Sequence, residues 1–155
     1  MGCGKSVVGV LVAQRAGAPF YDLDMIIESE AGISISEYFA TRGEAAFRRL
    51  ESRLLPTVLV PGAVAALGGG APLDDENWRL ITERAVTVFL ECAFETIWTR
   101  TRGTTGRPLA TGRSYDELRA LHEERLPLYR RAVHVVSSDA PADQVAAEIA
   151  RLWSG

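Results

Sequence analysis

A lysine and a hydroxyl group follow two glycines at the start of the chain, in MGCGKS. A phosphate-binding loop has the pattern G-x-x-x-x-G-K-[ST] between a buried strand and a helix, and its backbone N–H groups and lysine surround phosphate oxygens. Gly4, Lys5 and Ser6 match the closing part of that pattern, and an apolar helical pattern follows them. We therefore predict a nucleotide site here; the alternative is a flexible tag of small residues. The strand and the first glycine of the pattern have no counterpart in these six residues.

Two aspartates, Asp22 and Asp24, end the short apolar segment 19–24. They are two residues apart, so on a strand we expect both carboxylates to face the same way. Two like charges this close cost free energy unless a cation, a proton or solvent compensates them. The alternative is a solvated strand end with an aspartate N-cap for the next helix. Beside a nucleotide, Lys5 would neutralise phosphate charge, the Ser6 hydroxyl would bind Mg²⁺, and the aspartates would be a metal partner and a candidate base.

A second group of residues is suited to hold an anion. Arg48 lies in FRRLE, three positions before Glu51, so the two can pair on one face of a helix. A surface ion pair is the favoured interpretation for an isolated helix, whereas a substrate carboxylate would be gripped by the guanidinium group. Three consecutive glycines, 68–70, follow a strand pattern. They exceed what a turn requires, and we interpret them as a wall that a ligand approaches closely.

The segment 103–114, GTTGRPLATGRS, is long for a loop in a compact domain, and such loops are often lids. Its arginines, Arg107 and Arg113, could meet phosphate charge; the alternative is a solvated basic loop. Arg125 lies in ERLPLYRR, in the next helical pattern.

Hydrophobic periodicity predicts alternating helices and strands. Helical patterns cover 6–16, 25–31, 34–55, 74–84, 94–102, 114–129 and 141–153, with breaks expected near Gly43 and at Pro127. Strand patterns cover 19–24, 63–70, 85–91 and 132–138. Strands separated by helices imply an α/β fold with a parallel sheet covered on both faces. Ligands bind beyond the carboxyl ends of such strands, where the aspartate and glycine motifs fall.

Composition narrows the classes of function. The length of 155 residues predicts one domain, residues 1–155, with no linker or repeat. A net charge of −3 gives no electrostatic case for nucleic acid. No apolar run is long enough to span a bilayer, and no export signal is recognisable at the start, so we expect no membrane association. Two cysteines make no disulfide framework and suit the cytoplasm.

The ordered motifs GxGKS, FYDLD, FRRLE, LGGGA, RPL and ERLPLYR resemble the shikimate kinases, from residue 1 to about residue 153. The resemblance implies phosphorylation of the 3-hydroxyl of shikimate by ATP and Mg²⁺, on the route to chorismate and the aromatic amino acids. It also implies a monomer with the three-layer fold of the nucleoside-monophosphate kinases, a five-stranded parallel sheet in the order 2-3-1-4-5 with a mobile lid.

The resemblance also implies where the nucleotide and its metal bind. The residues expected around ATP are the loop Gly2, Cys3, Gly4, Lys5, Ser6 and Val7, with Val7 in place of the usual threonine, together with Arg100 and Pro141 on the two faces of adenine and Arg107 of the lid. Asp22, with Ser6, is expected to hold Mg²⁺, mostly through water.

The acceptor side follows in the same way. Asp24 is expected to bind the shikimate hydroxyls and act as the base. Arg48 and Arg125 are expected to grip the carboxylate beside the backbone of Gly69 and Gly70. Lys5, Asp24 and Arg107 would then be the catalytic residues.

Relatives in this family carry a central strand and the first loop glycine ahead of the position of Met1. We therefore expect the sheet of these 155 residues to lack its central strand, which would leave ladder groups unpaired on both neighbouring strands. Two alternatives remain open: another small-molecule kinase of this architecture, such as a gluconate kinase, or a truncated domain that binds ligands without catalysis. The paired arginines and the glycine wall argue against the first.

Overall fold

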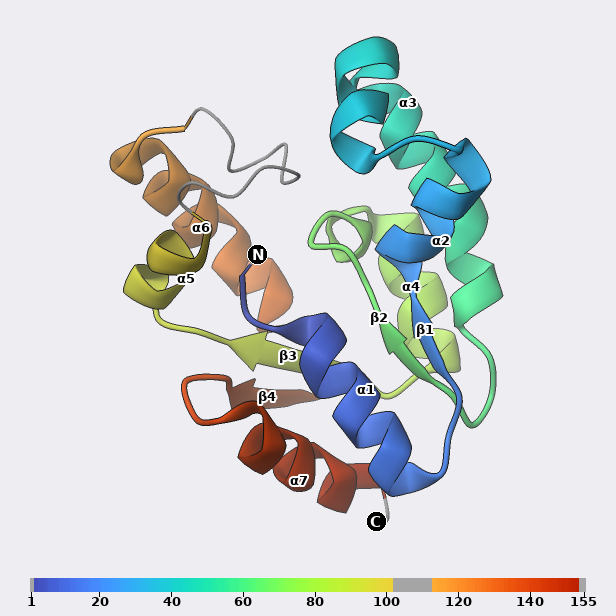
Figure 1. Cartoon of the computed structure of the whole chain (residues 1–155), viewed down its shortest axis with the longest axis vertical. Helices are drawn as coiled ribbons and strands as arrows, with labels where there is room; N and C mark the ends of the chain where they lie inside the picture. The colour runs from blue at the N-terminus through green and yellow to red at the C-terminus, as the bar shows by residue number, and fades with distance from the viewer. Residues whose placement is uncertain (1, 102–112, 154–155) are drawn as a thin grey trace.

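The computed structural model describes residues 2–101 and 113–153 (Figure 1). Helices and strands alternate along the chain as α1 (Lys5–Ala16), β1 (Phe20–Asp22), α2 (Leu23–Ala31), α3 (Ile35–Val58), β2 (Val64–Ala66), the 3₁₀ turn η1 (Ala71–Leu73), α4 (Asp75–Arg84), β3 (Val88–Glu91), α5 (Phe94–Thr101), α6 (Tyr115–Tyr129), β4 (His134–Ser137) and α7 (Ala142–Trp153). This confirms the predicted α/β alternation.

The strands form two separate parallel pairs. β1 pairs with β2, with Phe20 opposite Val64, and β3 pairs with β4, with Val88 opposite His134. In the described residues no strand joins the two pairs. The parallel pairing and the interrupted sheet are both as expected from the sequence.

A cavity of about 490 Å³ lies between the two pairs of strands and is lined by both β2 and β3. In a parallel ladder, the backbone groups of successive residues point to alternate sides. The Val64 N–H donates to Pro19 O at 2.9 Å and the His134 N–H donates to Thr87 O at 3.0 Å, which fixes the alternation in each pair. It leaves the backbone groups of three residues directed away from the partner strand: Ala65 on β2, and Val88 and Leu90 on β3.

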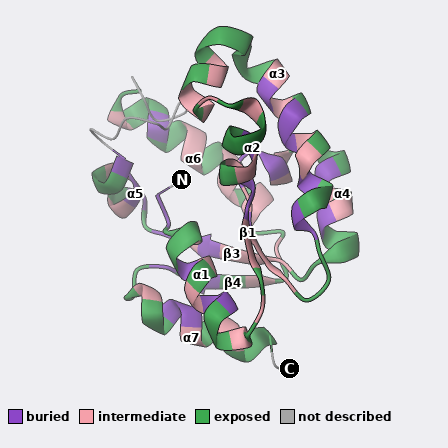
Figure 2. Cartoon of the chain, turned by 45° about the vertical axis from the view of Figure 1, so that its right-hand side comes forward, coloured by how far each residue is buried: buried purple, intermediate pink, exposed green. Residues whose placement is uncertain are grey.

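The apolar core is divided in the same way. One cluster of buried residues joins α1, β3, α5, β4 and α7, and the other joins α2, α3, η1 and α4. The buried residues of α3, α4 and α7 lie along one side of each helix (Figure 2). Gly9 of α1 leaves room for the Phe20 ring, which a Cβ at this position would meet at 2.5 Å. α1 therefore packs directly against β1, which positions its first turn beside the end of that strand.

Several bounds of helices and strands differ from the prediction. β1 ends at Asp22 because this residue caps α2, which already begins at Leu23. α6 runs through Pro127 to Tyr129, so the predicted break at that proline is wrong. The predicted break at Gly43 is confirmed, with φ of 77° and ψ of 166° inside α3. No helix in the described part of the chain is long and apolar enough to cross a membrane.

The cavity between the strand pairs predicts that an added strand stabilises the protein. Fusing a short Val/Ile-rich segment directly ahead of the chain should provide ladder partners for β2 and β3 and bury apolar side chains, each worth about 1.5–3 kcal/mol. We expect a higher melting temperature in thermal unfolding. A Gly/Ser segment of the same length is the control, and an equal shift with both segments would contradict the prediction.

Candidate functional site

α1 begins at a loop whose backbone conformation requires glycine. Gly2 and Gly4 have φ of 69° and 77°, a region that residues with a side chain rarely adopt. Gly4 offers no side-chain acceptor as N-cap, and no acidic residue lies in the first turn. By contrast, α2, α3, α4 and α6 each begin with a capping side chain. The first N–H groups of α1, with Lys5 at its first position, are therefore open to an anion, which the helix dipole favours.

Arg100, near the end of α5, binds the backbone of the phosphate loop. Its Nη1 donates to Gly2 O at 3.1 Å, and Cys3 beside it is buried in the core. The guanidinium group thus contacts the loop itself. Pro141 is exposed and immediately precedes α7. The contact of Arg100 and Pro141 with adenine stays a prediction.

Ser6 and Asp22 meet at the edge of the loop. Ser6 Oγ donates to Asp22 Oδ2 at 2.5 Å, while Asp22 Oδ1 accepts from the Asp24 N–H at 3.0 Å. A hydroxyl and a carboxylate are hard oxygen ligands, so the pair fits Mg²⁺. Within the described ranges no group of three or more His, Cys, Asp or Glu side chains is placed to hold a metal.

Asp24 lies in the first turn of α2 and not on the strand, so the prediction of two carboxylates alternating along a strand is wrong. It nevertheless lines the same pocket as Asp22, Lys5 and Arg48. Burial raises the pKa of the Asp24 carboxyl, the nearby Asp22 raises it further, and Lys5 lowers it by a smaller amount. Asp24 is therefore more basic than an ordinary aspartate.

Arg48 and Glu51 form an ion pair on α3 in which the carboxylate is buried and the guanidinium group is partly exposed. Arg48 Nη1 donates to Glu51 Oε2 at 2.8 Å, and Glu51 is 1% exposed. The predicted i, i+3 pairing is confirmed, whereas the interpretation as a surface pair is wrong. Arg48 also pairs with Glu44 at 3.0 Å and lies over the Phe47 ring, 5.2 Å from its centroid. The guanidinium group is therefore fixed before any ligand binds.

Glu51 is a site residue to which the sequence assigned no role of its own. Its second oxygen, Oε1, is buried without a hydrogen-bond partner. Burial raises the pKa of this carboxyl, and the bond from Arg48 opposes the rise. The sequence signal for Glu51 was its spacing of three residues from Arg48 in FRRLE. This spacing indicates that the two side chains pair, but not that Glu51 is buried.

The neighbouring side chains of the protein leave no room for a Cβ at Gly68 and Gly70, so these positions require glycine. A Cβ at Gly68 would lie 2.8 Å from Asp24 Oδ1 and 2.9 Å from Glu51 Oε1. A Cβ at Gly70 would overlap the Arg48 guanidinium group. In the structure, the groups that approach the wall closely are therefore the charged side chains of Asp24, Glu51 and Arg48, whereas the approach of a ligand stays a prediction.

Arg125 comes from α6 and does not line the pocket formed by the phosphate loop and the wall. It lies beside Tyr129, whose hydroxyl donates to Gly69 O at 2.6 Å. Arg125 Nη1 is buried and has no hydrogen-bond partner among residues 2–101 and 113–153, which suits an anion. Arg107, with most of the predicted lid 103–114, lies outside the described residues.

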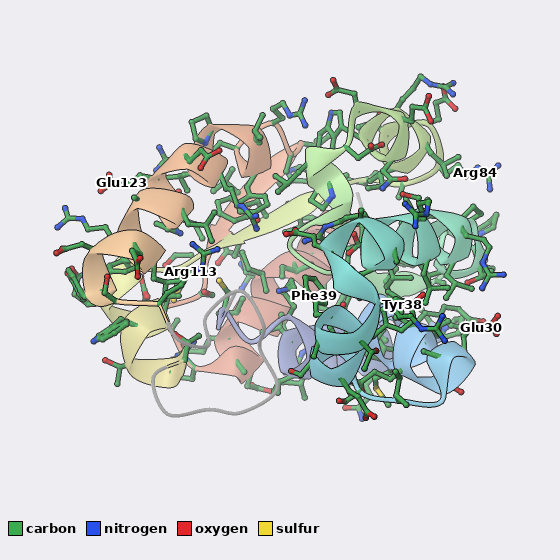
Figure 3. All side chains as sticks on the ribbon, turned by 90° about the horizontal axis from the view of Figure 1, so that it is seen from above. Glu30, Tyr38, Phe39, Arg84, Arg113 and Glu123 are labelled. Atoms are coloured by element: carbon green, nitrogen blue, oxygen red, sulfur yellow. The ribbon has the colours of Figure 1, made fainter. Side chains whose placement is uncertain are left out.

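One pocket of about 290 Å³ brings the predicted phosphate and acceptor residues together. Its lining includes Lys5, Asp24, Phe39, Arg48, Glu51 and Gly69. Phe39, labelled in Figure 3, comes from α3. A phosphate-binding loop beside such a pocket, at the carboxyl ends of parallel strands, defines an α/β kinase of the P-loop class.

Comparison with known proteins identifies the family. The family profile described as "Shikimate kinase" matches residues 1–153, and the chain belongs to the shikimate kinase family. The shikimate kinase of Ruegeria pomeroyi is 46% identical over 142 residues, covering 90% of this chain and 72% of that protein. The shikimate kinase of Salinibacter ruber is 42% identical, covering 96% of this chain and 78% of that protein.

Solved structures agree with this assignment. The shikimate kinase from Acinetobacter baumannii in complex with shikimate superposes with a TM-score of 0.94 at 32% identity, covering 99% of this chain and 88% of that chain. The shikimate kinase from Aquifex aeolicus superposes with a TM-score of 0.88 at 35% identity, covering 100% of this chain and 92% of that chain. The fold is therefore the P-loop kinase fold of this family.

The raised pKa of Asp24 predicts a pH-dependent cost to stability. The folded state holds the Asp24 proton more tightly than the unfolded state, so stability falls as pH rises through the folded pKa. Asp24→Asn removes this fall. We expect the variant to melt at a higher temperature than the wild type near pH 7, with a difference that shrinks toward pH 4.

Asp116→Asn is the matched control, since Asp116 also lies in the first turn of its helix but is exposed. It should give no stabilisation near pH 7. A lower melting temperature for Asp24→Asn than for the wild type near pH 7 would contradict the prediction.

Proposed function

We propose that the pocket between the phosphate loop and the glycine wall binds shikimate, and that its side chains carry the transfer of phosphate to the 3-hydroxyl. Membership of the family gives the reaction class, ATP-dependent phosphorylation of shikimate. The observation that carries the proposal is that Lys5, Asp24 and Arg48 line one pocket. Phosphate cradle, candidate base and anion clamp are then within reach of one small substrate.

The shikimate carboxylate is proposed to bind between Arg48 and Arg125, beside the backbone of Gly69 and Gly70. Support comes from the buried Nη1 of Arg125, which has no hydrogen-bond partner in the described part of the chain, and from the fixed guanidinium group of Arg48. A guanidinium fork matches a carboxylate in shape and charge. Binding there would set the direction in which the ring hydroxyls point.

Asp24 is proposed to orient the 3-hydroxyl and to accept its proton. Its raised pKa supports this role, because a general base works best when its pKa lies closer to the working pH. Phosphoryl transfer needs little other covalent chemistry and depends on positioning and charge neutralisation.

The phosphate side is proposed to consist of the N–H groups of the loop from Gly2 to Val7, with Lys5 on the outer phosphate oxygens. Ser6 and Asp22 would hold Mg²⁺, which supplies charge neutralisation on the phosphates when bound. Arg107 of the lid is proposed to reach the transferring phosphate.

We also propose that the enzyme is a cytoplasmic monomer. Cys3 and Cys92 are both buried cysteines, and so few cysteines suit a reducing compartment. The monomer is proposed because Lys5, Asp24 and Arg48 of one chain already line the pocket together.

The carboxylate clamp is tested by Arg125→Ala. Removing a charge-assisted contact should raise the KM for shikimate by roughly ten- to a hundredfold, about 1.5–3 kcal/mol, and leave the KM for ATP unchanged. The measurement is steady-state kinetics with each substrate varied. Arg119→Ala is the control, because Arg119 lies on the same helix and pairs with exposed Glu123. An unchanged KM for shikimate in Arg125→Ala would refute the clamp.

Arg48→Ala should differ from Arg125→Ala in one respect. It should raise the KM for shikimate and also destabilise the protein by about 3–5 kcal/mol, because it leaves the buried Glu51 without its partner. Kinetics and thermal unfolding of the variant separate the two effects. Loss of stability with an unaltered KM would leave Arg48 a purely structural role.

Lys5→Met tests the phosphate loop. Turnover should be abolished, whereas stability should change by no more than about 0.5 kcal/mol, as for a surface substitution. Arg15→Gln, at the other end of α1, is the control and should retain activity. Substantial residual kcat in Lys5→Met would show that this loop is not the phosphate cradle.

A further inference from the structure

Tyr129 connects two parts of the molecule that are 60 residues apart in sequence. Its hydroxyl, at the end of α6, donates to Gly69 O in the glycine wall at 2.6 Å. Its ring packs against the Phe89 ring of β3, with 5.4 Å between the centroids. The side chain is therefore held by its ring on one strand while its hydroxyl reaches the wall.

The Arg125 guanidinium group lies next to the same hydroxyl. Burial raises the pKa of the Tyr129 phenol, and Arg125 lowers it by a smaller amount. The phenol therefore stays protonated in the working pH range and acts as a donor. Arg125 and Tyr129 are four residues apart on α6, so they lie on the same face of that helix.

The bond to Gly69 fixes the orientation of the next peptide group. A trans peptide is planar, and its C=O and N–H point in opposite directions. With Gly69 O directed at Tyr129, the N–H of Gly70 is directed away from it. Gly70 lies against the Arg48 guanidinium group, where even a Cβ would overlap. The Tyr129 hydroxyl, which lies beside Arg125, thus orients the peptide group whose N–H belongs to Gly70, the residue that lies next to Arg48.

The end of α6 is attached to the same region at a second point. Arg131 Nη2 donates to Pro72 O at 3.1 Å, and its guanidinium group lies 4.7 Å from the Trp78 ring centroid. Pro72 belongs to η1, which directly follows the wall. Arg131, two residues after the end of α6, therefore anchors this end of the helix independently of Tyr129. The bond from the Tyr129 hydroxyl is then not needed to hold the helix, and its effect is on the orientation of the wall.

We propose that Tyr129 is a positioning residue for the substrate carboxylate. Its hydroxyl orients the Gly69–Gly70 peptide group and the Arg125 side chain so that both face the same carboxylate as Arg48. The inference rests on the proposed binding of the carboxylate between the two arginines. Tyr129 itself does not touch the reacting atoms and acts through the groups that it orients.

The test is Tyr129→Phe, which keeps the ring on Phe89 and removes only the hydroxyl. We expect the KM for shikimate to rise roughly three- to tenfold, with the KM for ATP and the melting temperature nearly unchanged. Tyr115→Phe is the matched control, since it removes the hydroxyl that contacts exposed Glu95, away from the pocket. It should behave as the wild type.

A double variant separates this inference from the clamp on which it rests. If Tyr129 acts through Arg125, Tyr129→Phe should have a smaller effect on the KM for shikimate in the Arg125→Ala background than in the wild type. A large effect of Arg125→Ala with none of Tyr129→Phe would overturn the role of Tyr129 and leave the clamp intact. Equal rises in both KM values together with a lower melting temperature would show a structural role only.

Discussion

The ion pair between Arg48 and Glu51 is the interaction on which the candidate site depends. A carboxylate that is 1% exposed is costly to bury, and the bond from Arg48 offsets part of that cost. The pair then occupies the space in which Gly68 and Gly70 would otherwise carry side chains. The burial of one glutamate therefore determines the composition of the neighbouring wall and the direction of the guanidinium group.

Much of the fold was predictable because its signals are local. Alternating apolar patterns predicted the helices and the parallel strands, and the glycines of the phosphate loop occupy positions that their φ angles require. Asp24 was misplaced because α2 begins directly after Asp22, which both ends the strand and caps the helix, and the sequence does not show where one element gives way to the other. The burial of Glu51 and the bond from Tyr129 to Gly69 depend on tertiary packing, which periodicity does not report.

Helices connect the two pairs of strands in the described residues. The two strand pairs contribute separate hydrogen-bonded ladders, and each has its own apolar cluster. α1 contacts both sides, since it packs on α7 and on β2. The helix that follows the phosphate loop is thus also the connection between the two halves of the core, which places that loop at their junction.

The two contacts made by Asp22 bear on attempts to change the substrate specificity of the enzyme. One of its oxygens caps α2 and the other receives the Ser6 hydroxyl, so a single side chain locates both the donor loop and the helix that carries Asp24. Donor and acceptor halves of the site are therefore not independent modules. Efforts to redirect the enzyme toward other alcohols by library selection would do best to diversify α3 and the wall region around it. Asp22 is better kept constant, because a change there would move the loop at Ser6 and the first turn of α2 together.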